Sequence, residues 1–286
     1  MTVPQSLYLG VIQGLTEFLP VSSTAHLILA PNFAPSFLKF TEEQPHAFDV
    51  ALHVGTLLAL LIYFRAEWGR LIRGGLSLLR ERTVDDDIDR KMALLIVLGC
   101  IPAAIAGPLL EKRVDELSDP HHHPASYLVM GVVFIVFGLL MGWVDRVSRK
   151  TRSVKNLSPG EAAFVGVAQA IALIPGVSRS GATITAGLVT GLTREAAARF
   201  SFLLSAPVVA GAAAWTGLKL LLHAVPGEEA LSAGVFIAGI LASAVVGWFC
   251  IHFLLEFLRK RTLWVFVFYR VVLGIFLIAF FIRGDH

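Results

Sequence analysis

Long apolar stretches constrain this chain more than any other feature of its sequence. Six of them reach the length of about 20 helical residues that a lipid bilayer requires. Only 16% of the residues are charged and 56% are hydrophobic, whereas a soluble domain carries roughly 25% charged residues. The sequence therefore predicts an all-α polytopic membrane protein with one membrane domain over residues 1–286. The six predicted spans are 47–64, 92–110, 126–144, 199–222, 231–255 and 263–282.

Two further apolar segments, 4–30 and 160–191, are interrupted near their middle. The interruptions read LPVSST in the first segment and IPGVSRSG in the second. Proline removes a backbone donor and disfavours helix at the residue before it, and glycine loosens the backbone. Each half is then too short to cross a bilayer. We expect two re-entrant helical hairpins, with a kinked full-length helix as the alternative.

The two interrupted segments resemble each other. A shift of 156 residues places GVIQGLTEFLPVSSTAHLILA, from Gly10, on GVAQAIALIPGVSRSGATITA, from Gly166, without a gap. Three spans follow each copy, and an odd number of crossings inverts the second copy relative to the first. We therefore expect an inverted-topology repeat over about 4–144 and about 160–282. The two hairpin tips would face each other near the middle of the membrane.

The distribution of basic residues predicts the orientation. Seven Lys and Arg residues lie in 65–91, five in 145–160 and three in 256–262, and Arg194 joins the same side. Only four lie on the other side. Cytoplasmic loops carry the excess of Lys and Arg. We expect both termini to lie outside, with the first hairpin entering from outside and the second from inside.

The second hairpin has the composition of an anion site. Arg179 lies among hydroxyl side chains directly before a helical run. A helix N-terminus offers free backbone N–H groups, and an arginine adds charge-assisted donors, so this tip is suited to phosphate. A plain helix cap with Arg179 paired to an acidic residue is the alternative. The hydroxyl residues at this tip are Ser178, Ser180 and Thr183.

The first hairpin offers complementary groups. Gln13 and Glu17 are four residues apart and share one helical face. A carboxylate that faces the same cavity as Arg179 suits a divalent cation bridging to phosphate oxygens. A structural salt bridge between Glu17 and Arg179 is the competing interpretation.

Hydroxyl and imidazole groups follow the first interruption. Ser22 and Ser23 precede His26, and a serine close to a histidine can act as a nucleophile with its base. A helix cap beside an interfacial histidine is the alternative. Asp49 and His53, four residues apart at the start of span 47–64, are further candidates for supporting roles.

Together, QGLTEFLPVSSTAH and PGVSRSGAT resemble the undecaprenyl-diphosphate phosphatase family, which is linked to bacitracin resistance. That family carries a (Glu/Gln)-x-x-x-Glu motif and a Pro-Gly-x-Ser-Arg-Ser-x-x-Thr motif. Here they read Gln13 to Glu17 and Pro175 to Thr183. The resemblance covers nearly the whole chain. It implies an integral membrane hydrolase that removes the terminal phosphate from C55 isoprenyl diphosphate and so recycles the carrier lipid for peptidoglycan and other envelope polymers.

The resemblance also implies roles for the residues. A catalytic core of Glu17, Ser23, His26 and Arg179 is expected, with phosphate bound by Ser22, Ser178, Ser180 and Thr183 and support from Gln13, Asp49 and His53. A divalent cation, Mg²⁺ or Ca²⁺, would bind at Glu17. Position 13 is Gln where many members carry Glu, and a neutral amide is a weaker ligand for a hard cation. The implied location is the bacterial inner membrane, with the site open to the periplasmic side.

Several matters stay open in the sequence. Ser23 as nucleophile with His26 as base, and a water activated by His26, are both compatible with it. A lipid-phosphate or small-anion transporter is the rival function, because inverted repeats usually serve alternating access. The net charge of +3 gives no indication of a nucleic-acid partner. The oligomeric state is open, with a homodimer as one alternative.

Overall fold

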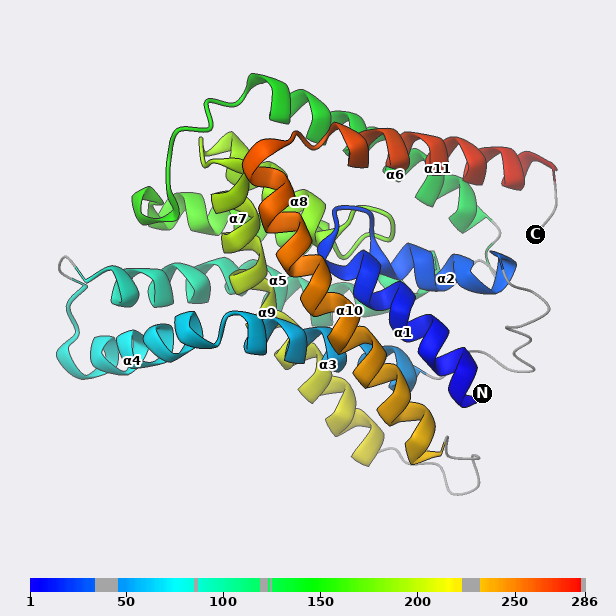
Figure 1. Ribbon diagram of the computed structural model, residues 1–286, viewed down its shortest axis with the longest axis horizontal. Coiled ribbons are helices and arrows are strands. Elements are labelled where there is room, and N and C mark those ends of the chain that lie inside the picture. The colour runs from blue at the N-terminus through cyan, green and yellow to red at the C-terminus, as the bar shows by residue number, and fades with distance from the viewer. Residues whose placement is uncertain (34–45, 85–86, 119–122, 124, 223–231, 284–286) are drawn as a thin grey trace.

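All regular elements in the described part of the chain are helical. The computed structural model describes residues 1–33, 46–84, 87–118, 123, 125–222 and 232–283 (Figure 1). One short 3₁₀ turn, Val154–Asn156, accompanies the α-helices. In chain order the α-helices are α1 Val3–Phe18, α2 Ser23–Phe33, α3 His46–Tyr63, α4 Arg65–Glu81, α5 Ile88–Ser118, α6 Ala125–Val147, α7 Pro159–Ile171, α8 Arg179–Val189, α9 Arg194–Leu222, α10 Ala233–Lys260 and α11 Trp264–Arg283.

In the described ranges, five helices are long and apolar enough to cross a membrane. They are α5, α6, α9, α10 and α11, and α3 and α4 form a sixth candidate if a bent pair counts as one span. The predicted spans lie within these helices with four exceptions. Residue 64 follows the end of α3, residue 263 precedes α11, residue 232 precedes α10, and residue 231 is outside the described residues. Several helices are longer than the predicted spans, because charged residues outside the apolar stretch are still helical.

The segment between the first two spans holds more structure than a connector. Helix α4 begins two residues after α3 ends and is bent from it by 84°. Leu71 and Gly74 are buried, and an added Cβ on Gly74 would lie 2.6 Å from the backbone carbonyl carbon of Asp89 on α5. Helix α4 therefore packs closely against the start of α5.

Both interrupted segments form pairs of short helices. Residues 19–22 separate α1 from α2, and residues 172–178 separate α7 from α8. The four helices contain 16, 11, 13 and 11 residues, fewer than the roughly 20 needed for a span. Each pair packs as a hairpin, as the sequence predicts.

The first helices of the two hairpins pack in a similar way. α1 packs mainly against α10, and its counterpart α7 packs mainly against α5. The crossings are made by matched glycines: an added Cβ on Gly10 would lie 2.7 Å from the Gly239 oxygen, and one on Gly166 would lie 2.3 Å from the Gly99 oxygen. Such close backbone approach requires small residues. Helix α6 packs along α11 at the side of the molecule (Figure 1).

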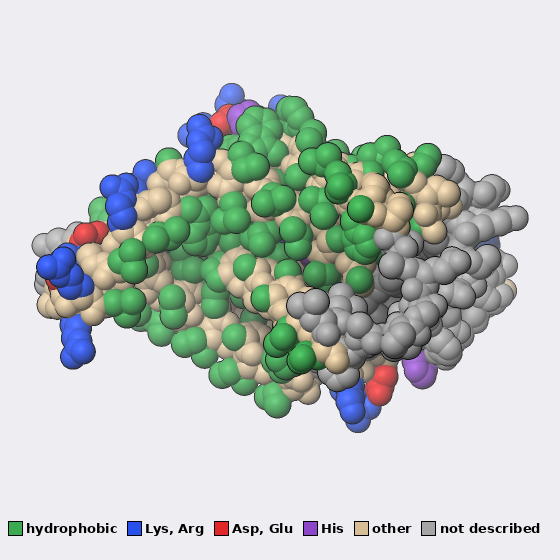
Figure 2. All heavy atoms as spheres, turned by 90° about the horizontal axis from the view of Figure 1, so that it is seen from below, with side chains coloured by type: hydrophobic (Ala, Val, Ile, Leu, Met, Phe, Trp, Pro, Cys, Tyr) green, Lys and Arg blue, Asp and Glu red, His purple; other side chains and the backbone are tan. Residues whose placement is uncertain are grey.

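The surface is consistent with a lipid environment. In Figure 2 hydrophobic side chains cover the middle of the face, and most Lys and Arg side chains in view lie at the left end and along the upper left edge, with one group at the lower edge. Large apolar residues such as Leu109, Phe268 and Ile282 are more than 70% exposed. Extensive apolar exposure is expected where the solvent is lipid. The chain is a multi-pass membrane protein.

Candidate functional site

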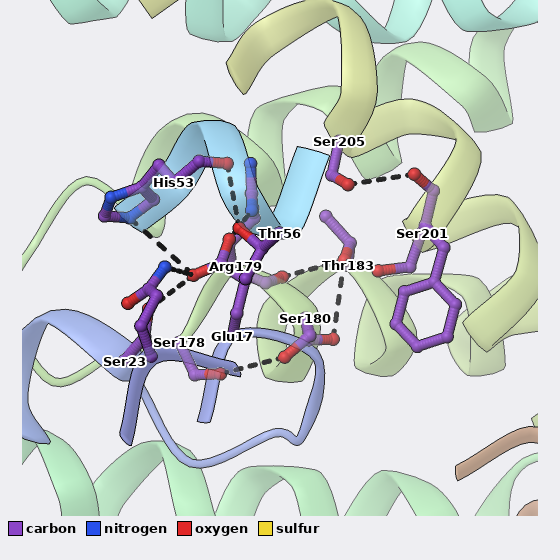
Figure 3. A network of polar contacts seen from close by, with 12 residues as sticks. Glu17, Ser23, His53, Thr56, Ser178, Arg179, Ser180, Thr183, Ser201 and Ser205 are labelled. Carbon is purple, nitrogen blue, oxygen red and sulfur yellow. Dashed lines mark hydrogen bonds and ion pairs between the residues drawn. The ribbon is translucent and has the colours of Figure 1, made fainter. Parts of the chain in front are cut away.

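The two hairpin tips meet through one buried ion pair (Figure 3). Glu17 lies in the last turn of α1, and its side chain is 4% exposed. Its Oε1 accepts a hydrogen bond from the guanidinium of Arg179, the first residue of α8. A second link joins the tips, because the Ser180 hydroxyl donates to the Leu19 carbonyl oxygen at 2.9 Å. Glu17 and Arg179 thus face one another as predicted, and they form the salt bridge that was the competing interpretation of these two residues.

Two other side chains donate to the same carboxylate. Ser23 Oγ donates to Glu17 Oε2 at 2.6 Å, and Gln13 Nε2 donates to the same oxygen at 3.0 Å. His53 Nε2 lies 3.7 Å from Glu17 Oε2. The carboxylate of Glu17 is therefore the centre of the polar cluster, and the first hairpin supplies two of its four partners.

His26 lies away from Ser23. Its Nδ1 is 2.7 Å from the Ser22 carbonyl oxygen, and its Nε2 is hydrogen-bonded to the Tyr269 hydroxyl. Its ring stacks on that of Tyr269 at 5.7 Å between centroids. Both ring nitrogens thus have partners other than Ser23. The predicted contact between Ser23 and His26 is not formed, because Ser23 turns toward Glu17.

The second tip has the expected hydroxyl groups at its helix start. Ser178 caps α8: its Oγ accepts from the Gly181 N–H at 3.2 Å and lies 3.2 Å from the Ser180 hydroxyl. Thr183 Oγ1 donates to the Arg179 carbonyl oxygen at 2.7 Å. It also lies 2.6 Å from the hydroxyl of Ser201 on α9, near the start of the predicted span 199–222.

Ser22 and Ser178 occupy matched places at the two tips. Each directly precedes the second helix of its hairpin, and their φ angles are +71° and +72°. Few residues other than glycine adopt positive φ, and the strain at such positions concentrates at functional sites. Ser22 is 6% exposed.

Of the two supporting candidates on α3, His53 is part of the cluster. Its Nδ1 is 2.8 Å from the Asp49 carbonyl oxygen, and its own carbonyl accepts from Thr56 Oγ1 at 2.9 Å. Asp49 thus orients His53 through its backbone. In the sequence, the only indication that His53 belongs to the site was its position one turn after Asp49.

Arg270 on α11 contacts both hairpin tips. The residue is 1% exposed. Its Nη1 donates to the Pro20 carbonyl oxygen at 3.3 Å, and its Nη2 donates to the Gly176 carbonyl oxygen at 2.8 Å. The guanidinium also lies over the Phe134 ring, 4.9 Å from its centroid. A charged residue in an apolar span is by default a functional candidate, and that signal was present.

The donor set around Glu17 fits a divalent cation only in part. No group of three or more His, Cys, Asp or Glu side chains able to hold a metal occurs in the described ranges. Gln13 Oε1, however, is buried without a hydrogen-bond partner in this part of the chain. Glu17 and this oxygen would supply two ligands. Mg²⁺ commonly takes one or two protein ligands and completes its shell with substrate phosphate and water.

Comparison of the sequence with known proteins identifies one family. The family model described as bacitracin resistance protein BacA matches residues 6–276. The chain is 46% identical to an undecaprenyl-diphosphatase of Trichlorobacter lovleyi, covering 98% of this chain and 97% of the relative. It is 41% identical to one of Pelobacter propionicus, covering 99% of both, and 43% identical to one of Moorella thermoacetica, covering 98% of both. The chain belongs to the BacA bacitracin resistance family.

Proposed function

We infer that this chain hydrolyses undecaprenyl diphosphate to undecaprenyl phosphate and inorganic phosphate. This activity would recycle the carrier lipid for peptidoglycan and related polymers and would confer bacitracin resistance. The carrying observation is the buried contact between Glu17 and Arg179, which brings an acid and a phosphate-binding group together at the two tips. Family membership over nearly the whole chain supports the substrate.

The terminal phosphate would bind at the second tip. Arg179 and the free N–H groups at the start of α8 neutralise its charge, with hydroxyls of Ser178, Ser180 and Thr183 around it. Arg179 must then exchange Glu17 for phosphate. Glu17 is released from Arg179 in this exchange, and its Oε2 remains the acceptor of the Ser23 hydroxyl proton.

Ser23 is placed to use that base. Its hydroxyl already donates to Glu17 Oε2 at 2.6 Å. We propose that Ser23 Oγ attacks the terminal phosphorus in line while Glu17 takes the proton. The bond between phosphorus and the bridging oxygen breaks, and undecaprenyl phosphate leaves. Water then hydrolyses the phosphoserine to release inorganic phosphate.

His26 has a different place in this proposal from the one that its spacing predicts. Its nitrogens are bound to the Ser22 carbonyl and the Tyr269 hydroxyl. We propose that it fixes the start of α2, and hence the position of Ser23. A water activated by His26 is the alternative route, and a trapped phosphoserine distinguishes the two.

A divalent cation, when bound at Glu17 and Gln13, would supply positive charge to phosphate oxygens. We propose Mg²⁺ or Ca²⁺ in this place, supported by the unpartnered Gln13 oxygen. We further propose the bacterial inner membrane as location, with both termini and the mouth of the site on the periplasmic side. The excess of Lys and Arg in 65–91 and 145–160 supports this orientation.

The test is phosphate release from C55 diphosphate by the purified protein in detergent, with and without EDTA. We expect EDTA-sensitive release that Arg179→Ala lowers about 10²–10³-fold, the usual cost of removing one charge-stabilising donor. Arg283→Ala, which changes an exposed arginine at the end of α11, is the matched control. Acid quenching should trap phosphoserine at Ser23. Full turnover by Ser23→Ala would exclude the serine route, and no release by folded protein would return the transporter to consideration.

A further inference from the structure

A narrow apolar cleft opens directly from the ion pair. Glu17 and Arg179 form its polar end, and in this structure the cleft is too narrow to admit a water-sized sphere. Its walls must therefore separate before a ligand can enter. Its apolar walls come from two spans and include Leu57 and Leu60 of α3 and Ala206 and Val209 of α9.

The walls of this cleft are well packed near the site. Leu60 and Ala206 are 1% and 3% exposed, and Val209 is 7% exposed. A chain that passes between α3 and α9 must therefore fit against these side chains. Their size decides what can pass.

Helix α9 changes from buried to exposed just beyond the cleft. Pro207 lies inside this helix, where it removes a backbone hydrogen bond. Before it, residues 200–206 are buried; beyond Val209, residues 210–212 are exposed. An added Cβ on Gly211 or Gly217 would meet nothing within 4 Å. The outer half of α9 stands at the lower edge of the molecule (Figure 1), on the face that hydrophobic side chains cover in Figure 2. The cleft thus leads from the ion pair to an apolar surface.

A second, larger cavity of about 290 Å³ does not serve the same purpose. It lies between α6, α7 and α8 and is lined by Phe137, Val167 and Ala182, with Arg270 at its wall. Neither Glu17 nor Arg179 lines it. The isoprenyl chain is covalently attached to the diphosphate. It must leave through an opening where the phosphate-binding groups lie, and the cleft between α3 and α9 is lined by them.

We propose that the isoprenyl chain of the substrate leaves the site between α3 and α9, and that Leu57 and Val209 determine which chains can pass. The proposal rests on the proposed function and adds a specificity site to it. The headgroup stays at the two tips, and the first isoprene units lie against the apolar walls. The remainder of the chain extends along the outer half of α9 into the lipid.

The first test compares substrates with and without a long chain. In Leu57→Trp and Val209→Trp, kcat/KM for C55 diphosphate should fall about tenfold or more, because a bulky ring overfills a fitted apolar passage. For a C5 alkyl diphosphate, whose chain ends near the headgroup, the loss should be less than about threefold. Val136→Trp, at a 54% exposed position on α6, is the matched control and should affect neither substrate. Equal losses for both substrates, or no loss for either, would overturn the proposal.

A second measurement needs neither turnover nor a variant. The wild-type protein in detergent is irradiated with a C55 diphosphate analogue that carries a photoreactive group on its second isoprene unit, and labelled peptides are identified by mass spectrometry. Labels on α3 near Leu57 and on α9 near Val209 are expected. Labels confined to the larger cavity near Val167 would refute the path. Because labelling does not require hydrolysis, failure of the path and failure of the proposed activity are distinguishable.

Discussion

Arg270 ties together the carbonyl groups of both hairpin tips. Pro20 and Gly176, whose carbonyl oxygens accept from it, are 156 residues apart and occupy the same place in the two copies of the repeat. One guanidinium therefore holds the two tips at a fixed separation. The ion pair between Glu17 and Arg179 depends on that separation, although Arg270 contacts neither residue through a hydrogen bond.

Arg270→Met tests this role, and its magnitude follows from the contacts. Two hydrogen bonds from a charged group are lost, each worth about 1.5–3 kcal/mol. The contact with the Phe134 ring adds about 1–2 kcal/mol. The variant no longer buries a charge, and the desolvation free energy saved offsets several kcal/mol of this loss. We expect a net loss of about 2–4 kcal/mol, or about 4–12 °C in Tm.

Activity should fall further than stability suggests. If the tips shift by about 1 Å, phosphate release should drop about 10²-fold, because positioning errors of this size have that cost. Thermal unfolding in detergent and phosphate release from C55 diphosphate measure the two effects. Arg270→Lys keeps the charge without the forked donors, so it should lie between wild type and Arg270→Met.

The matched control is Arg283→Met, which changes an exposed arginine at the end of the same helix. It should leave Tm and activity unchanged. If Arg270→Met were as stable and as active as Arg283→Met, the idea that one guanidinium fixes the separation of the tips would be refuted.

Two further predictions concern the scaffold. Gly166→Ala should lower the free energy of unfolding by about 1–3 kcal/mol, since its Cβ would lie 2.3 Å from a backbone oxygen of α5. The control is Gly69→Ala, which should be neutral or stabilising because its Cβ would have nothing within 4 Å. Equal melting curves for the two variants would contradict the close crossing of α7 and α5. Asp145→Asn should cost about 2–4 kcal/mol, because this 1% exposed carboxylate binds Arg194. The control is Glu116→Gln, which alters a surface ion pair and should leave the thermal melt almost unchanged. An equally small change for Asp145→Asn would contradict a stabilising role for the ion pair between Asp145 and Arg194.

The spans and the interruptions were predictable because they depend on local composition. An apolar stretch long enough for a bilayer predicts a helix without knowledge of its neighbours, and Pro20 and Pro175 mark the two breaks. The bend between α3 and α4 was not predictable in the same way. It occurs at Phe64, where the sequence has neither proline nor glycine, and α4 then packs against α5 through a tertiary contact at Gly74.

The site was predictable in its composition and less so in its pairings. Opposed tips follow from the inverted repeat, so the meeting of Glu17 and Arg179 could be expected from the amino-acid sequence alone. Spacing along a helix shows only which residues share a face. Ser23 and His26 share one by spacing, yet Ser23 binds Glu17 on α1 and His26 binds Tyr269 on α11. Neither partner lies on the same helix, so spacing alone could not identify it.

The two predicted copies of the repeat share a backbone conformation at their tips and differ in the side chains that the tips carry. Ser22 and Ser178 adopt the same positive φ at the same place in each copy. The position that carries Glu17 in the first copy carries Leu173 in the second, and the position of Arg179 corresponds to Ser23. Glu17 and Ser23 thus belong to the first tip, and Arg179 belongs to the second.

The matched glutamines show the consequence of this division. Gln13 donates to the carboxylate one turn later in α1. Gln169 occupies the same position in α7 and is 2% exposed, but a leucine follows one turn later, and neither of its amide atoms has a partner in the described part of the chain. A symmetric pair of hairpins with acids at both tips would repel a diphosphate, and one with arginines at both would lack a base. Differences at two matched positions therefore place the carboxylate at one tip and the guanidinium at the other, and the proposed hydrolysis requires this asymmetry.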